Sequence, residues 1–145
     1  MDNDMDISKC LASIQAEVIA AKMDNNVRYG LRWSVRNRLI KKALACVFGY
    51  RNVKVRQSYT WIDITIITER PHTGSCSTRY PEIRYYNYDY CNDCSLKKRA
   101  VESTAWSVIK QIGLYDEISR YTDDMGVIHE ECSIQVLFND EVRRH

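Results

Sequence analysis

Four side chains that favour transition metals follow one another at short spacings in the middle of the chain. Cys91 and Cys94 are separated by two residues, a common chelate spacing for a metal held at the start of a helix. His72 and Cys76 lie upstream and complete the pattern His-x3-Cys-x14-Cys-x2-Cys. One imidazole and three thiolates suit tetrahedral zinc. The sequence therefore predicts a zinc site at these four residues, as in a zinc-stabilised protein-interaction module. The alternative is that a chain of 145 residues folds without a metal.

A second candidate chemistry is metal-dependent cleavage of phosphodiesters, which needs acidic ligands on neighbouring strands. Asp63 lies in an alternating apolar segment, and Glu82-x-Arg84 lies in the next such segment. This layout resembles the restriction-endonuclease-like nuclease core, and the resemblance implies a divalent metal bound by Asp63 and Glu82. Arg84 stands where that family has a lysine near the attacking water. The structural alternative is that Asp63 pairs with Arg56 or Arg84 across a sheet.

Other catalytic patterns are absent from the sequence. It contains no glycine-rich phosphate loop, no Ser-His-Asp context and no His-Glu-x-x-His. A zinc deaminase would need His-x-Glu or Cys-x-Glu, whereas the chain has His72-Thr-Gly and Cys76-Ser-Thr. A redox Cys-x-x-Cys needs a parallel βαβ unit, which the sequence does not predict. We therefore expect a binding protein and not an enzyme.

Charge is distributed unevenly along the chain. Between Asp24 and Asp63 there are nine basic residues and no acidic one, whereas Asp116 to Glu141 holds eight acidic residues against Arg120 alone. The basic segment favours a polyanionic partner, because phosphates neutralised by Lys and Arg release counterions. The acidic segment argues against a protein that coats nucleic acid on all sides.

Aromatic residues accompany the basic residues in the predicted strands. Bases stack on exposed Trp and Tyr while Arg grips the backbone, although Tyr also serves protein interfaces. We therefore predict a surface that contacts nucleic acid or a nucleoprotein complex, with solvated helix faces and half-buried strand tyrosines as the alternative. Its candidate residues are Arg38, Lys41, Lys42, Lys54, Arg56, Trp61, Arg84, Tyr86, Tyr88, Lys97 and Lys98.

The segment CSLKKRAVESTAWSVIKQIG carries Lys97, Lys98 and Ala100 in the pattern Lys-Lys-x-Ala, followed by small residues. It resembles the second helix of the double-stranded-RNA-binding domain, and residues 29–112 show a similar αβββα order. The resemblance implies that the lysine pair and the helix N-terminus contact phosphates across a groove. The chain departs from that family in its loops, because RQSY lacks the family's His and YDYCNDC replaces a glycine-rich approach.

The elements that must position these residues follow from apolar periodicity. Helical spacing predicts helices over 5–23, over 29–48 and from Ser95 to Gly113, with a further turn in LYDEISRY. Alternation predicts strands in NVKVRQ and TWIDITIIT, joined as a hairpin, and in EIRYYNYDY and ECSIQVLFN. The order α-α-β-β-β-α-β indicates an α+β fold, a mainly antiparallel sheet with helices packed on one face.

The whole chain, 1–145, is expected to be a single domain with its αβββαβ core over 29–140. The N-terminus is acidic and no apolar run approaches the roughly 20 residues that a membrane span needs. Six scattered cysteines then indicate a cytoplasmic protein with reduced thiols and no disulfide framework.

In size and charge the chain is similar in style to the accessory and anti-defence proteins of phages and mobile elements, such as inhibitors of CRISPR effectors. Such an inhibitor would occupy a nucleic-acid channel with its acidic segment or compete for nucleic acid with its basic one. A homodimer through the tyrosine-bearing face is a further expectation that no motif specifies.

Overall fold

The computed structural model describes residues 3–25, 31–59, 61–72, 76, 90–118, 121–122, 124–129 and 131–142. Most of the tyrosine-rich strand expected in EIRYYNYDY lies outside these ranges. The same holds for four of the candidate positions, which are Glu82, Arg84, Tyr86 and Tyr88.

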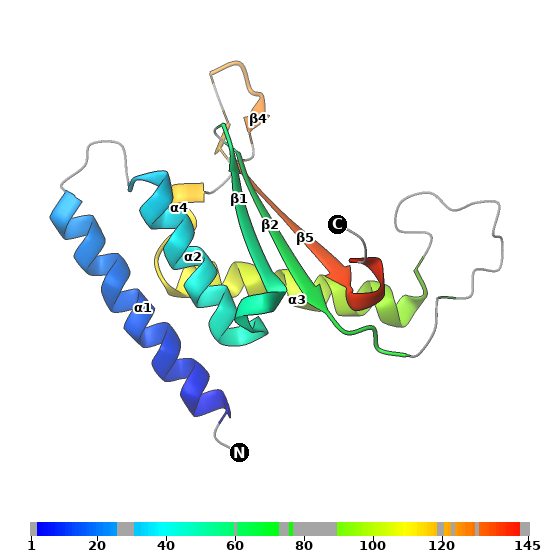
Figure 1. Cartoon of the computed structure of the whole chain (residues 1–145). Coiled ribbons are helices and arrows are strands. Elements are labelled where there is room, and N and C mark those ends of the chain that lie inside the picture. The colour runs from blue at the N-terminus through cyan, green and yellow to red at the C-terminus, as the bar shows by residue number, and fades with distance from the viewer. Residues whose placement is uncertain are drawn as a thin grey trace.

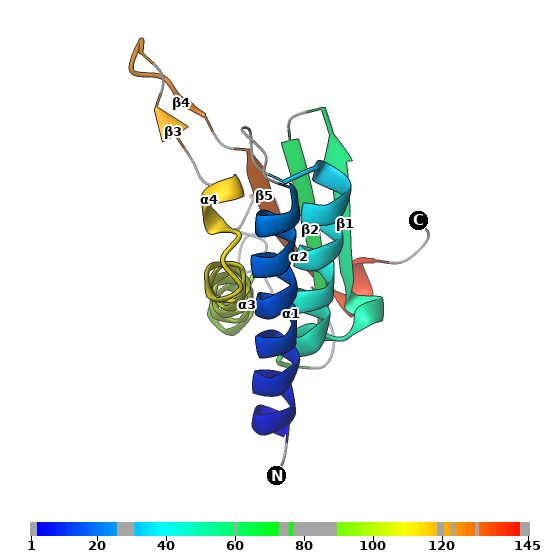
Figure 2. The same cartoon turned by 90° about the vertical axis from the view of Figure 1, so that its left-hand side faces the viewer.

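Two antiparallel helices form the N-terminal part of the molecule. α1 (Asn3–Asn25) and α2 (Trp33–Phe48) run side by side in opposite directions (Figures 1 and 2). α1 contains the predicted helix, and its apolar face is buried through residues such as Leu11 and Val18. Periodicity predicted a helix that starts at residue 29, whereas α2 begins at Trp33. Leu31 and Arg32 precede the helix, with Arg32 as its N-cap.

A three-stranded sheet in the order β1-β2-β5 forms the second layer. β1 (Val53–Ser58) and β2 (Trp61–Thr68) form the predicted antiparallel hairpin. β5 (Cys132–Phe138), also predicted as a strand, pairs with β2 in parallel. The expectation of a mainly antiparallel sheet is therefore only half right. The reason is that α3 (Asn92–Gln111) crosses between β2 and β5 and returns the chain to the starting end of the sheet.

The C-terminal half adds elements that periodicity found and others that it missed. α4 (Tyr115–Ile118) matches the helical turn expected in LYDEISRY, and Gly113, with φ of 85°, follows the end of α3. β3 (Tyr121–Thr122) and β4 (Ile128–His129) form a hairpin that projects from the body (Figures 1 and 2). Each of these strands has two residues, too few for an alternating pattern to be recognised.

One face of the sheet carries the core, which supports the α+β class. Ile62, Ile64 and Ile66 of β2 are buried in one apolar cluster with residues of α1, α2 and α3. The opposite face carries Lys54 and Arg56, which are exposed, and Trp61, which is half-buried. Among the described elements, the helices thus pack on one face and leave the other open, as the alternation of β1 and β2 predicts.

The expectation that all thiols are reduced is wrong at α1 and α2. Cys10 and Cys46 form a disulfide, with 6.1 Å between their Cα atoms. This separation lies within the usual range for a disulfide. The apolar faces of α1 and α2 pack against each other, and this packing brings the exposed Cys10 beside the half-buried Cys46. Among the described helices, none has the length and apolar character needed to cross a bilayer.

Candidate metal centre

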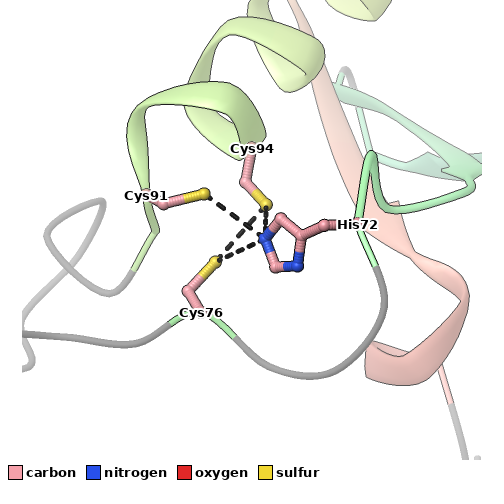
Figure 3. A group of neighbouring side chains, drawn as sticks. All are labelled: His72, Cys76, Cys91 and Cys94. Atoms are coloured by element: carbon pink, nitrogen blue, oxygen red, sulfur yellow. Dashed lines mark hydrogen bonds between the residues drawn. The ribbon is translucent and has the colours of Figure 1, made fainter.

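The four residues with metal-ligand spacing meet at one point in the structure. The ligand atoms of His72, Cys76, Cys91 and Cys94 all lie within 4.8 Å of one another. Their side chains point toward a common centre, where His72 after β2 and Cys76 face Cys91 and Cys94 at the start of α3 (Figure 3). Cys94 is fully buried and the other three are half-buried. The convergence of the four residues, which spacing alone had predicted, is confirmed.

The distances between the ligand atoms fit a tetrahedral ion. Nε2 of His72 lies 3.7, 3.4 and 3.2 Å from the sulfur atoms of Cys76, Cys91 and Cys94, respectively. The sulfurs of Cys76 and Cys94 are 3.3 Å apart. Tetrahedral zinc, with bonds of about 2.3 Å to sulfur and 2.0 Å to nitrogen, separates its ligand atoms by about 3.5–3.8 Å. The donor set and these four separations therefore suit one zinc ion.

The local chain geometry positions three of the four ligands, His72, Cys91 and Cys94. His72 lies in the chain after β2, and Pro71, whose ring fixes its φ dihedral, directly precedes it. Cys91 is the N-cap of α3 and Cys94 lies in its first turn, so their spacing of three residues brings both thiols to one side of the helix. α3 begins at Asn92, earlier than the predicted Ser95, and this earlier start places the Cys-x-x-Cys on a helix terminus.

Arg70 joins the thiols to the end of the sheet. Its Nη1 lies 3.1 Å from the sulfur of Cys76 and 3.4 Å from that of Cys94. Nε and Nη2 donate to the two carboxylate oxygens of Asp140 at 3.0 and 3.1 Å. The guanidinium also lies over the ring of Phe138, 4.5 Å from its centroid. Three thiolates and a neutral imidazole around a divalent cation carry one net negative charge, which Arg70 can offset.

The two cysteines at the start of α3 differ in acidity. The backbone amide of Cys94 stabilises the thiolate of Cys91 and lowers its pKa to about 6. Burial raises the pKa of the Cys94 thiol to about 12. A hydrogen bond to Asp140 raises the pKa of Arg70 further above its usual value, so this side chain keeps its charge. Metal binding would have to displace the proton of Cys94.

A second polar group lies beside Arg70 and ties α3 to the end of β5. Nζ of Lys98 lies 3.1 Å from Oε1 of Glu141 and 2.8 Å from the hydroxyl of Tyr90, which donates to Oε2 of Glu141. Burial would raise the pKa of Glu141, but the Phe138 amide, the Tyr90 hydroxyl and Lys98 outweigh it and lower the pKa. The charge of Lys98 is therefore engaged within the fold, whereas Lys97 makes no such contact with another described residue.

The candidate residues on the open sheet face lie together. Arg56 stands opposite Asp63 in the register of β1 and β2, and Lys54 is two residues along the same face. Oδ1 of Asp63 accepts hydrogen bonds from Nε1 of Trp61 and Oγ of Ser133, both at 2.8 Å. The indole is thereby held against the sheet, and Asp63 is engaged in the sheet instead of facing a cleft.

The basic residues of α2 are spread over different environments. Arg38 and Lys42 approach Glu17 of α1, with the shorter distance, 2.9 Å, made by Lys42. Nζ of Lys41 lies over the ring of Tyr50, 4.4 Å from its centroid. Arg36, which belongs to the basic segment, is buried, and its Nη2 donates to Gln57 at 3.0 Å. The acid-free segment is therefore less basic at the surface than its sequence indicates.

Sequence reasoning missed the residues that surround the metal ligands. Arg70 could have been suspected, because it lies two residues before His72 in the same loop. Asp140 and Glu141 carried no local signal, since only the parallel pairing of β5 with β2 brings the C-terminal turn beside Arg70 and Lys98. No protein-family model, no curated protein and no solved structure matches this chain.

Proposed function

We propose that this chain is a zinc-stabilised binding protein, in which His72, Cys76, Cys91 and Cys94 hold a structural zinc ion. The observation that carries the proposal is the convergence of four protein ligand atoms within 4.8 Å. Four protein ligands complete a tetrahedral site and leave no position for water or substrate, which is typical of structural zinc. The metal is therefore assigned a role in organising the fold and none in catalysis.

Two of the ligands bracket the tyrosine-rich segment of the sequence. Cys76 and Cys91 enclose RYPEIRYYNYDY, which carries Arg84, Tyr86 and Tyr88. Ligation of Cys76 and Cys91 would tether both ends of this segment to the metal centre. Such a tether lowers the entropy that a partner must offset on binding. We assign this segment to the binding surface.

The open sheet face supplies the other part of that surface. Lys54 and Arg56 are exposed there and attract phosphate groups, and Trp61 offers an aromatic side chain whose orientation is fixed by Asp63. The partner proposed is nucleic acid or a nucleoprotein complex, and inhibition of a host defence complex is one activity that such a surface would serve. Because Lys98 is engaged by Glu141, the proposal gives this face more weight than the start of α3.

The binding proposal is tested by charge reversal on the open face. Lys54→Glu with Arg56→Glu is expected to weaken salt-sensitive binding of single- and double-stranded DNA and RNA by about tenfold or more, and to reduce the salt slope by about 2. Lys9→Glu with Arg99→Glu makes the same charge change elsewhere and serves as the control. Equal losses in both variants would show that only net charge matters. The proposal would be wrong if the parent protein bound none of these nucleic acids and also bound no host complex after nuclease treatment.

A redox dithiol is a second candidate, favoured by the topology. Contrary to the expectation from sequence, β2, α3 and β5 form a parallel βαβ unit with the Cys-x-x-Cys at the start of its helix. A dithiol needs only Cys91 and Cys94, and does not account for the convergence of His72 and Cys76. Thiol counting on metal-free and metal-loaded protein separates the two, because bound zinc protects three thiols from alkylation and a disulfide removes two.

A further inference from the structure

A groove runs between α3 and β5, on the side of β5 that faces away from β2. Two adjoining hollows of about 760 and 380 Å³ share Arg99, Glu102 and Ile134 as lining residues, so they form one continuous groove. The larger hollow has the volume of an ordinary ligand site. One wall is a helix and the other is the outer strand of the sheet.

The strand wall presents backbone groups that have no partner in the described part of the chain. The amide of Ile62 donates to the carbonyl of Glu131 at 2.8 Å, which fixes the phase of the parallel ladder. In that phase the N–H and C=O groups of Ile134 and Val136 point away from β2, into the groove. Phe138 is the next residue whose N–H points away from β2, and this N–H already donates to Oε1 of Glu141 at 2.8 Å. The remaining edge is a template for another strand.

The helix wall supplies an aromatic pocket. Trp106 of α3 packs edge-on against Tyr115 of α4, with 6.0 Å between the ring centroids. Both rings line the larger hollow, together with small hydroxyl side chains such as Ser103. An apolar side chain that enters from the β5 edge would rest on these rings.

The charges of the larger hollow decide which class of partner fits it. Its two basic residues, Arg99 and Lys110, are balanced by two acidic ones, Glu102 and Glu131. The smaller hollow adds Lys98, whose charge is engaged by Glu141. A polyanion would therefore meet no net attraction in the groove, and both carboxylates would repel it. An extended peptide needs backbone partners and a side-chain pocket, and both are present.

We propose that this groove binds an extended peptide segment of another protein. The segment adds to the outer edge of β5 as a further strand, hydrogen-bonded to Ile134 and Val136, and places a large apolar side chain against Trp106. The site requires neither the zinc ion nor the basic sheet face, so it makes the chain a two-sided binding protein.

The probe for the test is a fluorescein-labelled peptide, Thr-Val-Phe-Val-Thr, compared with the same peptide N-methylated at both valines. The parent chain should bind the first and not the second, because methylation removes donors to the strand edge. Ser103→Trp fills the groove and should weaken binding by at least about tenfold, whereas Thr104→Trp, exposed on the same helix outside the lining, should not. Ile134→Pro deletes one outward donor and leaves the β2 ladder intact, so it should also abolish binding.

Several results would overturn the proposal. These are no binding of the peptide at about 1 mM, equal effects of the two tryptophan variants, or displacement of the peptide by oligothymidylate. A concentration-dependent dimer that Ile134→Pro dissolves would assign the edge to a second copy of the chain instead. Circular dichroism of each variant separates loss of binding from loss of fold.

Discussion

Two cysteine-based links hold different parts of this molecule together, and they require opposite conditions. The Cys10–Cys46 disulfide joins α1 to α2 and forms only by oxidation. The centre at His72, Cys76, Cys91 and Cys94 joins the end of β2 to the start of α3 and needs three reduced thiols. α1 and the start of α3 lie at opposite ends of the view in Figure 1. Cysteine spacing identified the second link and not the first, because a disulfide depends on helix packing, which spacing does not reveal.

The largest expected effect is loss of the metal centre. Cys94→Ser removes a fully buried ligand, so the variant should release its zinc. With free zinc about 1,000-fold above its dissociation constant, bound zinc contributes roughly 4 kcal/mol, which corresponds to a fall in Tm of about 10 °C. Calorimetry with and without a chelator measures this. Cys132→Ser changes another buried free cysteine, outside the cluster, and should keep its zinc. A chelator that leaves the Tm of the parent unchanged would contradict the account.

The disulfide should contribute less to stability than the metal centre. It is lost under reducing conditions, which the thiol ligands of the metal centre require. Cys10→Ser with Cys46→Ser opens a link between residues 36 apart, and such a link typically stabilises by about 2–4 kcal/mol through the unfolded chain. Urea unfolding with and without a phosphine reductant should show this loss in the parent and no reductant effect in the double variant. The zinc content should be the same in both proteins. If reduction also released zinc, the two links would not be independent.

Arg70 should raise the zinc affinity of the metal centre although it is not a ligand. Arg70→Gln removes the donors to Cys76 and Cys94 and the pair with Asp140, and should weaken zinc binding by about 10- to 100-fold. Competition with a chromophoric chelator measures the affinity. Arg51→Gln, exposed on the turn after α2, is the control for charge alone. Equal affinities in the Arg70 and Arg51 variants would show that Arg70 is only a structural contact.

The smallest effect is expected for the contacts among Lys98, Tyr90 and Glu141 beside the metal centre. Glu141→Gln weakens the contacts with Lys98 and Tyr90 and should cost about 1 kcal/mol at neutral pH. Because the folded pKa of Glu141 is lowered, this contribution is present above the unfolded pKa of about 4.3 and is lost as the pH falls through the folded value. Unfolding free energies of parent and variant should therefore converge in acid. A difference that stays constant with pH would exclude the carboxylate as its source.

The extent to which sequence predicted this structure depended on the range of the interactions. Alternation in TWIDITIIT and helical spacing in α1 and α3 are local, so the buried face of each element was correctly predicted. The parallel pairing of β5 with β2 is not local, and it could not be read from either strand. The metal ligands were predicted because zinc imposes a donor type and a spacing on the sequence. Asp140 reaches Arg70 only through that parallel pairing, and so it was missed.

Zinc binding by the four ligands can be measured on the purified protein. The most direct test is the metal content of the parent chain and of Cys94→Ser, both purified under reducing conditions without added metal and measured by elemental mass spectrometry. We expect one zinc ion per chain in the parent, none in the variant, and a thiolate-to-cobalt absorption band when Co²⁺ replaces zinc in the parent. A parent chain without zinc that also fails to bind Co²⁺, or a variant with the same zinc content as the parent, would contradict this expectation.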